Sequence, residues 1–181
     1  MKERVTKLMM RLARLEKKGS GFIDLSGQDF SGQDFSGWDM SRSDLSGADF
    51  SKANLEGANL SGCKADGTNF NGANLSNCKA DGTNFENSNF IDANLQGSVF
   101  TECYMKMTSL NRSDLSKGEF WLCDFSLADM RGCLANVGTL MNESNFHKAN
   151  LEGSVLFGDI VNCRLESCFL KGVKFRSNKI A

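Results

Sequence analysis

The chain has no proline, one histidine, one tyrosine and no long apolar run among its 181 residues. A single histidine leaves little for His-based catalysis or a His-rich metal site. No apolar stretch approaches the roughly 18 residues of a membrane span, so we expect no segment to cross a membrane. Residues 1–18 lack the unbroken apolar stretch and cleavage site of a secretory signal, which makes the cytoplasm the expected compartment.

The charge and cysteine content exclude two further classes. With 40% apolar and 24% charged residues and a net charge of −1, the chain is too apolar for a wholly disordered protein. Its seven cysteines are an odd number, which disfavours a disulfide framework. Glycine and phenylalanine are abundant instead, with 18 and 14 copies.

A five-residue period organises almost the whole sequence. From Leu25 every fifth residue is apolar as far as Leu140; the frame then slips by one residue to Phe146 and slips back at Ile160. We call this apolar position the centre. A small residue stands two positions before it and Asp or Asn one position before it, while Ser and Gly often follow. A period of five fits neither a strand nor a helix, so it predicts a chain that turns after every short extended step.

This pattern, as in Ala48–Lys52 (ADFSK) and Ala53–Gly57 (ANLEG), resembles that of the pentapeptide-repeat proteins. The resemblance covers about residues 22–180, in some 32 pentads. It implies an all-β solenoid, a right-handed quadrilateral β-helix with four pentads in each of about eight coils. Centres and small residues would point inward.

The first 18 residues differ from the rest and predict a capping α-helix. They place apolar residues on one helical face: Val5, Leu8, Met9, Leu12 and Leu15. The small positions of the first coil hold residues too large for a narrow interior: Ile23, Gln28, Gln33 and Trp38. A solenoid needs its open end covered, so we expect 1–18 to cap a single rod domain of residues 19–181. The basic amphipathic segment 1–18 could still lie on a membrane surface, but we expect it to cap the rod and expect no membrane partner.

All seven cysteines lie two residues before a centre, where Cys acts as a small buried apolar residue. No nucleophile, base and orienting group are brought together by the repeat. We therefore expect no catalytic residues, no metal, no cofactor and no enzymatic activity.

The outward acidic residues are concentrated near the start of the rod. Residues 19–100 carry 11 acidic and four basic residues, and six carboxylates recur at successive pentads: Asp24, Asp29, Asp34, Asp39, Asp44 and Asp49. Two interpretations stay open. Asp suits this turn position and keeps the rod soluble, or the carboxylates imitate the phosphates of duplex DNA.

The second half of the rod carries outward apolar residues. Five are expected to form an interface stripe: Trp121, Leu134, Met141, Val155 and Val161. At the C-terminal end no following helix covers the last coil, and we expect a homodimer to bury its apolar residues: Leu165, Phe169, Leu170, Phe175 and Ile180.

The family resemblance also suggests a function. Pentapeptide-repeat proteins act mostly by binding other proteins, and one group resembles duplex DNA, binds DNA gyrase and protects it from quinolones. The leading hypothesis is therefore a DNA mimic that binds a DNA-handling protein such as gyrase and does not itself contact nucleic acid. The alternative is an interaction scaffold without DNA mimicry, whose working surface is the Trp121 stripe.

Overall fold

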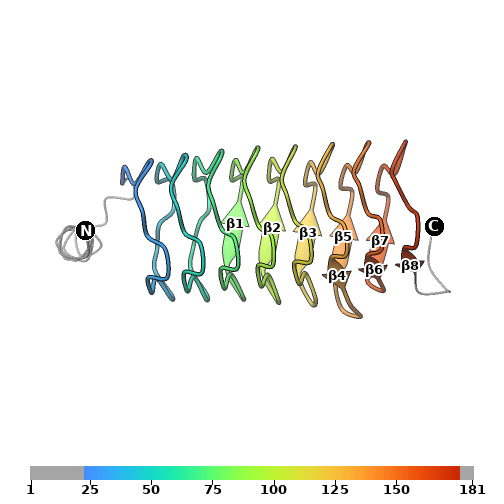
Figure 1. Ribbon diagram of the computed structural model, residues 1–181, viewed down its shortest axis with the longest axis horizontal. Coiled ribbons are helices and arrows are strands. Elements are labelled where there is room, and N and C mark those ends of the chain that lie inside the picture. Colours follow the sequence, from blue (N-terminus) through green and yellow to red (C-terminus); the bar gives the residue numbers. More distant parts are fainter. Residues whose placement is uncertain (1–22, 176–181) are drawn as a thin grey trace.

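The computed structural model describes residues 23–175, which form a rod of successive backbone coils stacked along one axis (Figure 1). This confirms the predicted β-solenoid. The described stretch contains no helix, and thus no helix long and apolar enough to cross a membrane. The predicted capping helix over 1–18 lies outside the described residues.

Short strands mark the places where two or three consecutive residues pair with the next coil, and isolated bridges join the coils elsewhere. They are β1 (Lys79–Asp81), β2 (Val99–Thr101), β3 (Glu119–Trp121), β4 (Leu134–Ala135), β5 (Leu140–Asn142), β6 (Val155–Leu156), β7 (Asp159–Val161) and β8 (Lys174–Phe175). All pair in parallel, in one sheet of order β1-β2-β3-β5-β7 and another of order β4-β6-β8. Paired strands come from consecutive coils, so each coil templates the next.

Four ladders of parallel bridges give the rod four faces. Asp24 pairs with Asp44, and Asp29, Asp34 and Asp39 each pair with the residue 20 positions later. We name the faces after these first residues: the Asp24, Asp29, Asp34 and Asp39 faces. A coil of 20 residues is therefore four pentads, one on each face, as predicted.

A tight turn follows each centre and forms the corner between two faces. Its second residue has a positive φ, as at Gly27 (61°) and Lys52 (57°). The N–H of Gly27 donates to the carbonyl of Ser46 in the next coil at 2.9 Å, and the N–H of Gln28 donates to the carbonyl of Leu25 at 3.3 Å. Glycine adopts a positive φ without steric cost, which explains its frequency at this position.

The interior is filled by the centres and by the small residues beside them. All centres from Leu25 to Met130 are buried. Along the Asp29 face the rings of Phe30, Phe50, Phe70 and Phe90 stack at centroid distances of 5.0, 5.6 and 4.9 Å. Such stacking of aromatic rings adds stability beyond the buried area.

One predicted frame is wrong at the corner formed by residues 136–138. The sequence pattern places Leu140 at a centre and Met141 outward, but Met141 is only 1% exposed and pairs with the core residue Phe120. The corner holds one extra residue, so the ladder step grows from 20 to 21. Thr139 thereby takes the small position and donates its hydroxyl to the carbonyl of Leu115 at 3.2 Å.

In the following coil, the corner at the same place (residues 157–158) is one residue shorter than usual, so the ladder step falls to 19 residues. This corner packs on the extended one. Gly158 lies so close to Thr139 that a Cβ at Gly158 would press on the Thr139 carbonyl oxygen and lie 2.8 Å from the Thr139 Cβ. Real Cβ atoms do not approach other atoms so closely. The shortened coil therefore depends on a glycine here.

Replacing Gly158 with Ala should lower the free energy of unfolding by about 1–3 kcal/mol, because the backbone must shift to admit the methyl group. Thermal or urea unfolding followed by circular dichroism measures this. The matched control is Gly67→Asn, since Asn87 adopts the same positive φ one coil further on. Equal stability of Gly158→Ala and the wild type would contradict the packing described for this corner.

Candidate interaction surfaces

The six predicted aspartates encircle the N-terminal end of the rod. Those of the first coil, Asp24, Asp29, Asp34 and Asp39, lie on four different faces, and Asp44 and Asp49 follow on the first two faces. They therefore form a ring with a second layer on two adjacent faces. The negative charge is densest on the Asp24 and Asp29 faces, where two carboxylates are stacked, so a basic partner is attracted most strongly to that side.

The turn after five of these six carboxylates holds the carboxylate in the ionised form. Ser26 donates its hydroxyl (2.6 Å) and its N–H (3.0 Å) to Oδ1 of Asp24, and these bonds lower the pKa of Asp24. Hydrogen bonds from the serine two residues later also lower the pKa values of four others: Asp29, Asp34, Asp39 and Asp44. Hydrogen bonds to a carboxylate favour its charged form, so these groups stay negative at neutral and mildly acidic pH.

Some of these carboxylates are explained by the fold alone. The amide Nδ2 of Asn54 donates to Oδ1 of Asp34 at 3.1 Å, and Asn74 and Asn94 continue this side-chain ladder at the same distance. Each amide needs an acceptor in the coil before it. Within residues 23–175 no coil precedes the one that holds Asp34, so an acceptor-only side chain at this position is a natural start for the ladder.

The second layer of carboxylates is explained only in part in this way, because Asp49 accepts a hydrogen bond from Nδ2 of Asn69 at 3.0 Å. Asp44 stacks on Asp24, and Asp49 stacks on Asp29. An Asn at either upper position would donate to the carboxylate below, as Asn54 does to Asp34. Like charges paired across strands are instead destabilising. An Asn oxygen could also accept the bond from Asn69, as Asn54 accepts one from Asn74, so the ladder does not require the charges of the second layer.

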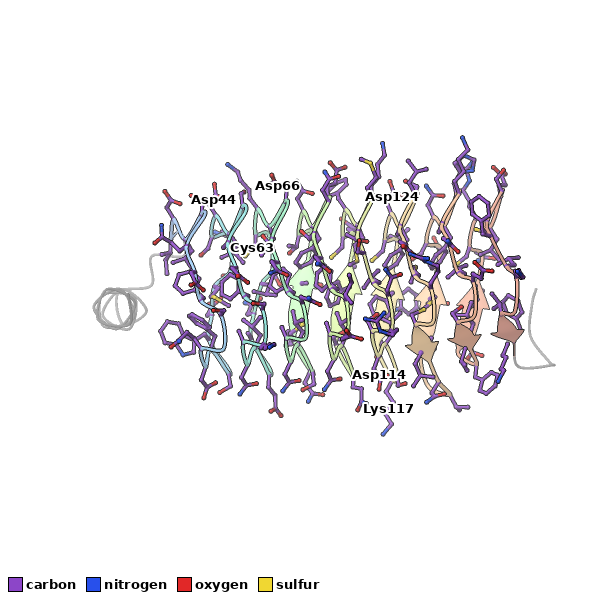
Figure 2. All side chains as sticks on the ribbon, viewed as in Figure 1. Asp44, Cys63, Asp66, Asp114, Lys117 and Asp124 are labelled. Carbon is purple, nitrogen blue, oxygen red and sulfur yellow. The ribbon has the colours of Figure 1, made fainter. Side chains whose placement is uncertain are left out.

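Further acidic residues lie in the turns at the corner between the Asp24 and Asp29 faces. Asp66 accepts a hydrogen bond from the hydroxyl of Ser46 at 3.0 Å, and Glu86 follows at the same position of the next coil. One ion pair offsets them, between Lys64 and Asp44 at 3.9 Å. Figure 2 shows Asp44 and Asp66 on one side of the rod and Asp114 and Lys117 on the opposite side.

The predicted apolar stripe is not a single stripe. Trp121 in β3 and Val161 in β7 belong to the five-stranded sheet, and Asn142 lies between them in register. Leu134 and Val155 pair with each other on the other sheet. Met141, the remaining member, is buried in the core because of the inserted residue. The five residues thus lie on two faces and in the interior.

The structure shows an exposed residue that the stripe prediction omits. Met107 is exposed at a turn, one coil before Leu127 and in the same column. Counting in steps of 20 residues would have aligned the two.

The C-terminal end of the described rod is apolar and open. Phe169 is 62% exposed and Leu170 41%, whereas Leu165 and Phe175 are half-buried. Ile180, the last residue predicted for this surface, lies outside the described residues.

The cysteines occupy the predicted inward positions as free thiols. Burial raises the pKa values of Cys63, Cys78 and Cys133 to about 12, and burial together with the adjacent Cys123 raises that of Cys103 further. A thiol with a raised pKa is a poor nucleophile. Within residues 23–175, no three His, Cys, Asp or Glu side chains are placed to hold a metal ion.

Comparisons with known proteins agree with this geometry. A family model described as "Pentapeptide repeats" matches residues 23–62, 68–106 and 93–132, more than half of the chain, with eight copies. Among curated protein sequences no relative matches significantly.

Several solved structures have a similar fold. HetL, a pentapeptide repeat protein involved in heterocyst differentiation regulation in the cyanobacterium Nostoc, is 25% identical, with a TM-score of 0.81 over 87% of this chain and 72% of HetL. A pentapeptide repeat protein of the Arabidopsis thaliana thylakoid lumen is 32% identical, with a TM-score of 0.51 over 52% of this chain and 66% of its own. QnrB1, a plasmid-mediated fluoroquinolone resistance protein, is 20% identical, with a TM-score of 0.51 over 87% of this chain and 88% of its own.

Proposed function

The chain belongs to the pentapeptide-repeat family, and from this membership we propose that it is a non-enzymatic protein-binding rod of the cytoplasm. Its target is a DNA-handling protein, such as DNA gyrase or another type II topoisomerase, whose basic DNA-binding surface it occupies. The whole chain then forms about eight right-handed coils, closed at the N-terminal end by a helix over 1–18.

The observation that carries this proposal is the second layer of carboxylates. Asp44 on Asp24 and Asp49 on Asp29 place like charges at the spacing of parallel strands, about 4.8 Å, on two adjacent faces. The fold would be better served by Asn at the upper positions. A basic groove that accepts duplex DNA offers the opposite charge to such a surface, and complementary charge raises association rates and sets specificity.

A gyrase supercoiling assay tests the proposal. Adding the purified protein to gyrase and relaxed plasmid should inhibit supercoiling, or should reduce cleavage caused by a quinolone. The control is the same protein after heat denaturation. Supercoiling and quinolone-induced cleavage that are both unaffected by an excess of folded protein would exclude gyrase as the target.

A second candidate function is an interaction scaffold without DNA mimicry. The observation that favours it is the exposed apolar surface around Trp121 in the second half of the rod. Under this alternative, charge removal at the N-terminal end is silent and Trp121→Ala abolishes binding. Met141 is buried and therefore is not part of this surface.

We also propose that the rod forms a homodimer through its C-terminal end. Pairing there would bury Phe169 and Leu170, and two-fold symmetry makes one apolar surface complementary to itself. Phe169→Ser should shift the protein from dimer to monomer at micromolar concentration with little loss of stability, since Phe169 is exposed. Light scattering coupled to size exclusion measures this, and a wild-type protein that is already monomeric would contradict it.

A further inference from the structure

Three apolar residues stand where the fold favours polar ones. Of the fifteen non-glycine residues with a positive φ in the described part of the chain, twelve are polar or charged. The other three are Met107 (φ 56°), Leu122 (φ 55°) and Leu127 (φ 60°). A left-handed backbone conformation costs free energy for any residue with a Cβ. Exposing an apolar side chain to water is also unfavourable. Both costs fall on the same three positions.

The three residues lie together across one face. In one coil, Leu122 follows the corner residue Trp121 on one edge of the Asp24 face, and Leu127 lies at its other edge. In the coil before it, Tyr104 lies on the face and Met107 at the edge. Their exposed fractions run from 36% for Trp121 to 57% for Tyr104. We call these five residues the Tyr104 patch. Asp124 lies on the face between Leu122 and Leu127, and its Oδ1 accepts the N–H of Ser126 and the Nδ2 amide of Asn145.

Opposite charges border the two edges of the patch. Glu102 and Glu143 precede and follow Leu122 in its column of stacked turns. On the other edge, Lys148 follows Leu127 in its column and Lys106 is next to Met107. None of these four charged side chains forms an ion pair with another residue in the described part of the rod. The edges are therefore free to pair with charges on a partner.

A second copy of this chain does not suit the surface. Rods side by side in the same direction would bring the acidic N-terminal half of one Asp24 face, with Asp24 and Asp44, against its equal. Rods side by side in opposite directions would bring Glu102 against Glu143. Like charges meet in both arrangements, and such contacts disfavour association.

The surface suits a helix in size and pattern. The patch and its charged borders extend over three coils, from Glu102 to Glu143. The two steps between these coils span about 10 Å along the rod, which is roughly two turns of an α-helix. Leucines at every third or fourth position of a helix form a stripe that can lie along the face. Basic residues on one flank of that helix would meet Glu102 and Glu143, and acidic residues on the other would meet Lys106 and Lys148.

We propose that the Tyr104 patch binds a short amphipathic helix of a partner protein, with an apolar stripe flanked by basic residues on one side and acidic residues on the other. This inference rests on the proposed protein-binding function and names a second contact surface for it. It uses none of the ring aspartates, so it can fail or hold independently of the DNA-mimic hypothesis.

The chain itself supplies variants that remove the patch without disturbing the turns. Met107→Asn, Leu122→Asn and Leu127→Asn introduce the residue found in the same columns at Asn87 and Asn162, with the same positive φ and no added charge. The melting temperature of the triple variant should therefore equal or exceed that of the wild type. Lys52→Asn, at a turn far from the patch, is the matched control.

The probe is a designed 16-residue peptide, acetylated, amidated and labelled with fluorescein. It carries four leucines in one helical stripe, with Lys on one flank and Glu on the other. Two comparison peptides keep the leucines and carry Lys on both flanks or Glu on both flanks. Fluorescence anisotropy in low salt measures binding to the full-length wild type, the triple variant, the Lys52→Asn control and a Glu102→Lys/Glu143→Lys variant.

The mixed-flank peptide should bind the wild type and the control at least about tenfold more tightly than the triple variant. The Glu102→Lys/Glu143→Lys variant, with two basic edges, should prefer the peptide with Glu on both flanks. Equal binding of the mixed-flank peptide to the wild type and to the folded triple variant would overturn the proposal. So would dimerisation of the wild type that the triple variant loses, because a second copy would then be the occupant.

Discussion

A rod carrying Leu55→Asp should fail to fold. Leu55 is fully buried at a centre of the Asp34 face, and its N–H donates to the carbonyl of Asn74 at 2.7 Å. A carboxylate there would have no partner and no water, and burying an unpaired charge is among the most destabilising changes a protein can suffer. We expect a loss of more than about 4 kcal/mol in the free energy of unfolding.

Circular dichroism and thermal unfolding measure this loss. The matched control is Leu55→Met, because Met40, Met105 and Met130 already occupy centres elsewhere in the rod. That change should cost less than about 1.5 kcal/mol. A folded Leu55→Asp variant with a melting temperature near that of the wild type would contradict the position of Leu55 in a filled core.

Changing four ring aspartates to asparagine should weaken target binding and leave the fold intact. The four are Asp29, Asp34, Asp44 and Asp49. The attraction of one exposed charge is weak, so the four losses together should weaken binding by about fourfold to several hundredfold at low salt. Binding by the wild type should also weaken steeply as salt rises, and that dependence should be smaller in the variant.

The rod itself shows why the variant should fold. Asn54, Asn59, Asn69 and Asn74 occupy the equivalent position in later coils, and each Oδ1 accepts the N–H of the residue two positions later. The control removes four carboxylates from the second half of the rod: Asp114, Asp124, Asp129 and Asp159. If both variants lose binding equally, the position of the charge is irrelevant and the ring has no special role.

Much of the fold could be predicted because each position of the five-residue repeat has one structural role and therefore one preferred type of residue. A centre such as Phe50 is apolar because it faces a closed interior, and Gly27 marks a corner because φ is positive there. The 20-residue coil is predicted from the same five-residue pattern, and the inward cysteines from their position two residues before a centre. The position of each ring aspartate on its own face also follows once four pentads make a coil.

The frame between residues 136 and 141 could not be read from apolarity alone. Leu140 and Met141 are both apolar, so either satisfies the centre. The deciding signal is weaker: Thr139, two residues before Met141, can donate a hydroxyl into the interior as Thr68 and Thr83 do. The stripe prediction failed at Met141 for this reason.

The central claim is tested most directly by displacement of DNA from purified gyrase. A fluorescent duplex bound to gyrase should be released by the wild-type rod, in a salt-dependent manner. The Asp29, Asp34, Asp44 and Asp49 to Asn variant should release much less at the same concentration, because four charges are lost from the surface that imitates DNA. If the wild type releases no duplex, or if the variant releases it equally well, the protein does not act on gyrase as a mimic of DNA.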